Sequence, residues 1–221
     1  HWFPKLYTNE TFYSACARYA SQASYGSYSK IMEDLFGIST AHVRTDFPSH
    51  LQAFLQRLPS GHEFTVDRLI DHHTLLPFYR PFLPRKTSRR IRSIMIDSPR
   101  GISVDALLGI MPLRISPLEF LRYCPICIGE DRDRYGESFW HREHQVPGIT
   151  ACAVHAVWLE TSIVGSRFPQ TKQQLISADK AATVFAPRTL DTSDEYHGLI
   201  LKLAKDAAWL LRNPHLPPKP R

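Results

Sequence analysis

Apolar residues recur at every third or fourth position in several stretches of the chain, which is the spacing of an amphipathic helix. The first stretch covers residues 10–23 and includes Cys16, which we interpret as a buried thiol on the apolar face. The same spacing predicts further helices at 28–36, 49–58, 65–73 and 103–110. The first part of the chain is therefore expected to be a helical domain, for which a helix-turn-helix-like arrangement is one option.

A segment rich in proline and aromatic residues, 77–84, follows the fourth predicted helix. Pro77 is expected to end or bend that helix, because proline has no amide hydrogen to donate to the preceding turn. The segment has two interpretations, a rigid connection packed on the core or a docking surface for another protein, and we favour the connection.

The pattern changes after residue 115. Residues 138–141 and 157–159 have the character of short strands, whereas 166–192 are polar and weakly patterned and are expected to form a linker or loop. A last helix is predicted at 193–212, either packed on the core or leading into a further domain. We therefore expect a mainly α fold with three parts: a helical domain (1–115), a small module (116–165), and a linker with a C-terminal helix that leads to a missing domain (166–221).

Composition and charge favour a globular protein with an anionic partner. Apolar residues make up 43% of the 221 residues, and 27 Lys and Arg against 21 Asp and Glu give a net charge of +6. Such a balance favours nucleic acid as a partner. With no signal peptide and no stretch able to span a membrane, we expect a cytoplasmic protein without membrane contact. The chain begins with His1 rather than methionine, so we expect a fragment of a longer protein.

Four residues have the spacing of a structural zinc site. Cys124 and Cys127 form a Cys-x2-Cys pair, and after 24 residues Cys152 and His155 form a Cys-x2-His pair. Two such pairs supply the four ligands of a tetrahedral zinc ion. Disulfides or buried thiols are the alternatives, but three clustered cysteines completed by a histidine fit a metal better. We predict one structural Zn²⁺, because a catalytic site usually keeps one position open for water.

Other residues near the two pairs leave alternatives open. His141 and His144 could replace His155 or add a second site, although we interpret them as surface residues or hydrogen-bond partners of the ligands. Trp140 and Trp158 are expected to shield the metal rather than to stack on bases.

The main positive cluster precedes the metal motif. No acidic residue occurs in 74–96, and apolar residues predict a helix in the second half of the cluster. Arginine and lysine bind phosphates independently of base sequence, so the cluster is a candidate DNA contact, and a solvated helical face is the alternative. Arg80 precedes the candidate residues, which are Arg85, Lys86, Arg89, Arg90 and Arg92.

The chain carries no motif typical of an enzyme. A Gly-rich phosphate loop, a serine nucleophile elbow and the His-Glu-x2-His zinc-protease motif are all missing from the sequence. His141-Arg142-Glu143 follows the Cys pair, which is the reverse of the order in zinc deaminases. The acidic residues of 130–137 alternate with basic ones, so we expect an exposed, salt-bridged loop rather than a metal nuclease site. We therefore predict that the chain is not an enzyme.

The residues around the two pairs resemble the TniQ/TnsD family, the target-selection proteins of bacterial transposons. The resemblance covers roughly residues 3–160, and its N-terminal part includes Phe3-Pro4 and the residues 7–18, 48–51 and 73–79. The segments that resemble the zinc-binding ribbon of the family are 121–127, 134–137, 139–142, 147–148 and 152–155.

The resemblance implies a target-site selector of a TnsABC-type transposon. Such a protein binds attachment-site double-stranded DNA and recruits a TnsC-type AAA+ ATPase, without being a catalyst. It also implies that Cys124, Cys127, Cys152 and His155 ligate Zn²⁺ in a ribbon, and that Trp2, Phe3 and Pro4 are candidate ATPase contacts. Two alternatives stay open: a module that docks only on the ATPase while a missing C-terminal part reads DNA, and a zinc enzyme.

Overall fold

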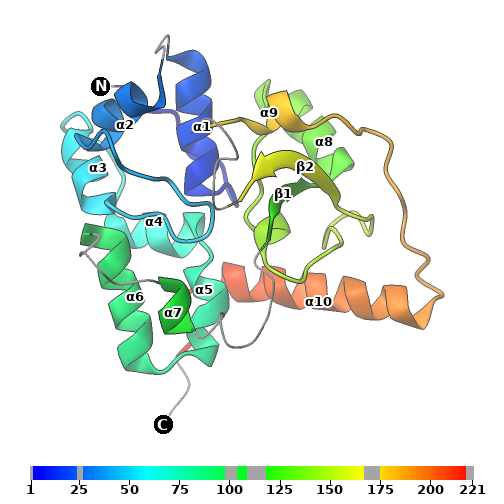
Figure 1. The fold of residues 1–221 in the computed structure, drawn as a ribbon. Helices are drawn as coiled ribbons and strands as arrows, with labels where there is room; N and C mark the ends of the chain where they lie inside the picture. The colour runs from blue at the N-terminus through cyan, green and yellow to red at the C-terminus, as the bar shows by residue number, and fades with distance from the viewer. Residues whose placement is uncertain (1, 24–26, 98–103, 109–117, 167–174, 218–221) are drawn as a thin grey trace.

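Helices dominate the computed structural model, which describes residues 2–23, 27–97, 104–108, 118–166 and 175–217. The first helices pack around one core at the left of Figure 1. Their bounds are α1 (Phe12–Gln22), α2 (Tyr28–Phe36), α3 (Leu51–Arg57) and α4 (Val66–His73). The mainly α fold and the helices predicted from periodicity are confirmed, with ends that differ by at most two residues.

Side-chain caps fix where three of these helices begin. The hydroxyls of Thr11, Ser27 and Thr65 each accept a hydrogen bond from the amide three residues later. Such a bond satisfies one of the amides that have no partner inside the helix. At the other end of α2, Gly37 has a φ of 67° and closes the helix in the left-handed conformation that glycine adopts without strain.

The proline-rich segment is helical rather than irregular. It forms α5 (Leu76–Tyr79) and the 3₁₀ helix η1 (Arg80–Phe82), which lead to α6 (Arg85–Asp97) and α7 (Val104–Leu108). The helix α4 ends at His73, before Pro77, so Pro77 does not break it. Pro77 lies instead in the first turn of α5. Amides in a first turn have no acceptor inside the helix, so a residue without an amide hydrogen is tolerated there.

The small module combines two strands with a helix. β1 (Phe120–Tyr123) pairs antiparallel with β2 (Glu160–Gly165), and Arg122 lies opposite Thr161. Between the strands lie α8 (Pro125–Tyr135) and the 3₁₀ helix η2 (Glu143–Gln145). The expectation of an exposed loop at 130–137 is therefore wrong, because Pro125 starts a helix there and Gly136, with φ 78°, ends it. The two other predicted strands make only isolated bridges, at His141, Val157 and Trp158.

The C-terminal part folds back on the rest of the chain. Among the described residues of the expected linker, α9 (Ala178–Ala181) is buried in the main core, and Tyr123 Oη accepts the amides of Thr183 and Val184. The last helix, α10 (Glu195–Arg212), begins at its Asp194 cap and packs against α4, α5 and η2 (Figure 1).

The helix α10 buries only part of its apolar stripe. Ala204, Ala207 and Leu211, which follow the predicted apolar spacing, are buried together with Ala208. Leu199 and Leu203 follow the same spacing but are 54% and 49% exposed.

One core extends across the predicted boundary at residue 115. Tyr123, Ile128 and Trp140 of the small module are buried together with Phe12 and Phe54 of the helical part. The division of the chain at 115 and 165 stays a prediction. In the described ranges, no helix has both the length and the apolarity that crossing a membrane requires.

Candidate metal centre

The strand β1 and the start of α8 position the first pair of candidate ligands. Cys124 follows β1 directly and is the N-cap residue of α8, so Cys127 lies in the first turn of that helix. Pro125 between them has the fixed φ that the first helical position requires. This arrangement directs both sulfur atoms to one side of the helix start.

A tight turn brings the second pair to the same place. The Cys152 amide donates to Val157 O at 2.8 Å, and the Ala156 amide donates back to Cys152 O at 3.1 Å. Ala156 closes the turn with a φ of 51°, and its carbonyl accepts the Leu190 amide. His155 therefore lies on a turn whose two ends are hydrogen-bonded.

The four side chains converge at distances that suit a tetrahedral metal. Cys127 Sγ lies 3.8 Å from Cys152 Sγ, and His155 Nδ1 lies 3.5, 3.3 and 3.6 Å from the sulfur atoms of Cys124, Cys127 and Cys152. Bond lengths of about 2.3 Å for Zn–S and about 2.0 Å for Zn–N predict tetrahedral edges of about 3.8 and about 3.5 Å. The three thiols and the imidazole therefore fit Zn²⁺ in both donor type and geometry.

The electrostatics of the cluster favour a bound cation. Hydrogen bonding from Cys127 and Cys152 lowers the pKa of the Cys124 thiol to about 4, whereas the same contact raises the pKa of Cys127. The buried cluster thus stabilises the Cys124 thiolate at the expense of Cys127, and a divalent cation would offset the charge of all three thiolates. His155 Nε2 lies 3.2 Å from Glu130 Oε2, a contact that holds the ring with Nδ1 toward the sulfur atoms.

A small apolar core encloses this cluster and connects it to α10. Val146, Val157 and Leu190 pack around the cysteines together with Ala207 and Leu211 of α10. Trp158 packs partly against this core, as expected for a residue that shields the metal. Trp140 does not, and the expectation for it is wrong. It lies in the main core, where its indole nitrogen donates to Ile176 O at 2.9 Å.

The two intervening histidines are not surface residues. His144 is 1% exposed, and neither of its ring nitrogens has a hydrogen-bond partner among the described residues. Burial lowers its pKa, so the ring is neutral. His141 stacks on Phe139 with 4.3 Å between ring centroids, and its Nε2 lies 2.8 Å from Asp131 Oδ2. With Cys127 they form a second group of close candidate ligands, but Cys127 also belongs to the first group.

A buried charged cluster joins α1 to the end of α8. Arg18 Nη1 donates to Glu10 Oε2 at 2.9 Å, and its Nε donates to Glu137 Oε1 at the same distance. Desolvation raises the pKa of Glu10 from 4.5 to about 7, although the Arg18 charge opposes this shift. The sequence shows Glu10 only as an acidic residue near a helix start. It does not indicate the cluster with Arg18 and Glu137, because that cluster forms only when the end of α8 packs against α1.

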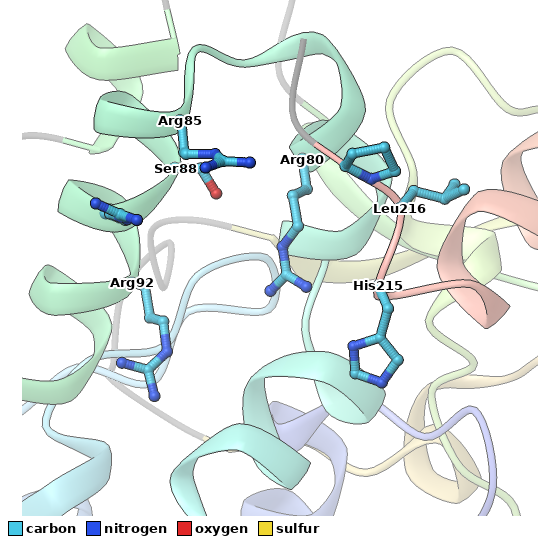
Figure 2. Close-up of a pocket in the computed structure, with 8 residues that line it drawn as sticks. Arg80, Arg85, Ser88, Arg92, His215 and Leu216 are labelled. Atoms are coloured by element: carbon cyan, nitrogen blue, oxygen red, sulfur yellow. The ribbon is translucent and has the colours of Figure 1, made fainter. Parts of the chain in front are cut away.

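The candidate DNA residues all lie on α6, but the structure separates them. An open groove of about 470 Å³ lies along one side of the helix (Figure 2). Its lining consists of Arg80, Arg85, Ser88, Arg89, Arg92, His215, Leu216 and Pro217. Lys86 and Arg90 are exposed and do not line this groove. No sequence pattern connects His215 with α6. The position of His215 in the groove follows only from the packing of the C-terminal segment.

The three N-terminal candidate residues differ in their exposure. Trp2 is 57% exposed and stacks against Tyr19 with 6.1 Å between ring centroids. Phe3 packs edge-on against Phe54 at 4.8 Å, and Pro4 is buried. Of these three residues only Trp2 presents most of its surface to solvent.

Fold and centre together define a helical protein whose Cys3His cluster lies in a small two-stranded module of the zinc-ribbon kind. The chain belongs to the TniQ family, whose model matches residues 1–159. It is also 31% identical over 153 residues to the Transposon Tn7 transposition protein TnsD of Escherichia coli. The matched region is 69% of this chain but only 30% of that relative, so the chain corresponds to less than a third of the relative's length.

Proposed function

We propose that this chain selects target sites for a TnsABC-type transposon by binding attachment-site DNA and recruiting a TnsC-type AAA+ ATPase. The observation that carries the proposal is membership of the TniQ family over residues 1–159. The similarity to a Tn7 transposition protein supports the same role. The chain acts as an adaptor between DNA and ATPase and not as a catalyst.

A single structural Zn²⁺ maintains the module. Its proposed ligands are Cys124, Cys127, Cys152 and His155, whose candidate ligand atoms all lie within 4.8 Å of one another. The bound ion supplies a positive charge that ties β1, α8 and the 152–155 turn together. Four protein ligands fill a tetrahedral shell and leave no position for a reacting water, which opposes a zinc enzyme.

The N-terminus is the proposed ATPase contact. Because Trp2 is exposed and lies on Tyr19, its indole can insert into a pocket on a partner, as aromatic residues at the centre of interfaces do. Phe3 and Pro4 are packed inward and hold Trp2 in place. DNA binding is supported by the net charge of +6 and by the exposed cations of α6.

A second candidate function is a module that docks only on the ATPase, while residues outside this sequence read DNA. The exposed apolar side chains of α10 favour it, because apolar groups displayed along one element often mark a protein interface. These side chains are Tyr196, Leu199, Leu203 and Trp209.

Two binding measurements separate the two functions. Fluorescence anisotropy with duplex DNA from the insertion site of the parent transposon tests DNA binding, and a pull-down with the cognate ATPase tests recruitment. A selector binds both, whereas a docking module binds only the ATPase. We expect Trp2→Ala to reduce ATPase capture by ~10-fold or more, as loss of an aromatic anchor does, and to leave DNA affinity intact. Zinc-loaded protein that binds neither partner would contradict both functions.

A further inference from the structure

We propose that the groove between α6 and residues 214–217 binds the phosphate backbone of duplex DNA through Arg85, Arg89 and Arg92, whereas Lys86 and Arg90 lie outside this site. The inference rests on the proposed DNA-binding function and assigns it to one face of one helix. It differs from the sequence-based expectation, which treated all five cations alike.

The three arginines share a face because of their spacing. Residues at i, i+4 and i+7 lie within about 60° of one another around a helix, whereas Lys86 and Arg90 are turned away by about 100° from Arg85 and Arg89 respectively. Ile91 and Met95 lie on the side of α6 that is buried against the core, which fixes the rotation of the helix about its axis in this structure. Figure 2 shows Arg85 and Arg92 reaching from α6 toward the segment that carries His215.

The groove contains cations that are free to bind an anion. Within the described residues, neither Arg85 nor Arg89 has a hydrogen-bond or ion-pair partner. Arg92 pairs with Asp67 at 2.6 Å, but both side chains are exposed, by 40% and 73%, so water and salt screen the pair and a phosphate can displace it.

Unlike Arg85 and Arg89, Arg80 makes contacts within the protein. It lies 2.7 Å from Asp71 and also donates to Pro214 O, so it fixes the C-terminal segment beside α6. This contact places His215 opposite the arginine face. Asp67 and Asp71 are the carboxylates paired with groove arginines, and neither lines the groove itself. The groove therefore has one wall formed by the arginines of α6 and a second wall formed by residues 215–217.

The shape and lining of the groove favour the backbone of a duplex. Its volume of about 470 Å³ and its open form suit a polymer passing along the surface better than a single enclosed phosphate. From Arg85 to Arg92 the helix rises by about 10 Å, so the row can face more than one phosphate, and guanidinium groups bind phosphate oxygens in pairs. Among the described residues that line it there is no Phe, Tyr or Trp, so these residues offer no stacking platform of the kind that single strands require.

Matched double variants on the same helix test the assignment. Arg85→Ala with Arg89→Ala and Lys86→Ala with Arg90→Ala each remove two positive charges from exposed positions of α6. We expect the first pair to weaken binding of a mixed-sequence duplex by ~10-fold or more and to lower the slope of log affinity against log salt by about two. The second pair should cause a clearly smaller loss of affinity and a smaller change of slope. Thermal melting confirms that both variants fold.

The outcomes separate this inference from the proposed function. If both variant pairs lose the same affinity, general basicity and not the groove binds DNA, and the inference is wrong while the function stands. If the unmodified chain binds no duplex but captures the ATPase, the DNA-binding function fails and the groove assignment fails with it. A further variant, His215→Ala, is expected to weaken binding only when Arg85 and Arg89 are present, because both walls then contact the same backbone.

Discussion

At the scale of single residues, the buried carboxylate of Glu10 depends strongly on its surroundings. It is fully buried, and Arg18 is its charged partner. Desolvation outweighs this partner and raises the pKa of Glu10 to about 7. The folded state therefore holds a proton on Glu10 that the unfolded chain releases near pH 4.5.

This shift predicts a pH dependence of stability. Between about pH 4.5 and about pH 7 the folded chain binds more protons at Glu10, so the stability that this group contributes is present below that window and is lost as the pH rises through about 7. Relative to Glu10→Gln, the free energy of unfolding of the unmodified chain should fall by up to about 3 kcal/mol across the window. Urea unfolding at a series of pH values measures both proteins. If the free energy of unfolding depended on pH in the same way for the unmodified chain and for Glu10→Gln, the raised pKa of Glu10 would be contradicted.

At the scale of elements, α10 shows that helical periodicity identifies a helix and its apolar stripe, but not how much of the stripe is buried. Packing against α4, α5 and η2 covers the edge of the stripe with Ala204, Ala207 and Leu211. Small alanines allow the helix backbone to approach its neighbours closely, while Leu203 remains half exposed.

Two leucines on α10 test this choice of face. Leu211→Ala should lower the free energy of unfolding by about 2–4 kcal/mol, because Leu211 is 1% exposed and its removal leaves a cavity beside the metal cluster. Leu203→Ala removes the same atoms from a half-exposed position and should change stability by less than about 0.5 kcal/mol. Equal costs for the two variants, measured by denaturant unfolding, would mean that α10 packs differently in solution.

At the scale of the whole molecule, two hydrophobic cores built from different elements stabilise the fold. The larger core joins α1–α4 and α6 to Tyr123 and Trp140 of the small module. The smaller core surrounds the cysteines and includes the C-terminal half of α10. A metal ion bound by the proposed ligands would therefore stabilise the position of α10 as well as the module itself.

Removal of zinc is expected to loosen the smaller core first. Chelation should raise amide hydrogen exchange in 124–159 and in α10 by ~10-fold or more, while α1 and α4 keep most of their protection, because their core contains none of the ligands. Cys152→Ser should reproduce this pattern without chelator, and Cys16→Ala, a buried thiol outside the cluster, should bind zinc normally. Native exchange in a zinc-free protein would exclude a structural role for the metal.

Several local features of this protein follow from neighbouring residues in the sequence. The helix start at Thr65 depends on a hydroxyl three residues from an amide, and the candidate ligands depend on the Cys-x2-Cys and Cys-x2-His pairs, so neighbouring residues specify both. Even α8 had local signals, a proline after Cys124 and a glycine at 136, which the charge alternation of 130–137 obscured.

Features that depend on distant parts of the chain follow only from the packing of the folded protein. The place of Trp140 in the main core, the pairing of Glu10 with Arg18 and Glu137, and the buried face of α10 each depend on which elements pack together. The same holds for the groove, where His215 lies opposite arginines of α6 that are more than a hundred positions earlier in the chain. The periodicity of one segment carries no information about its neighbour in space, because burial and desolvation arise from the packing of whole elements.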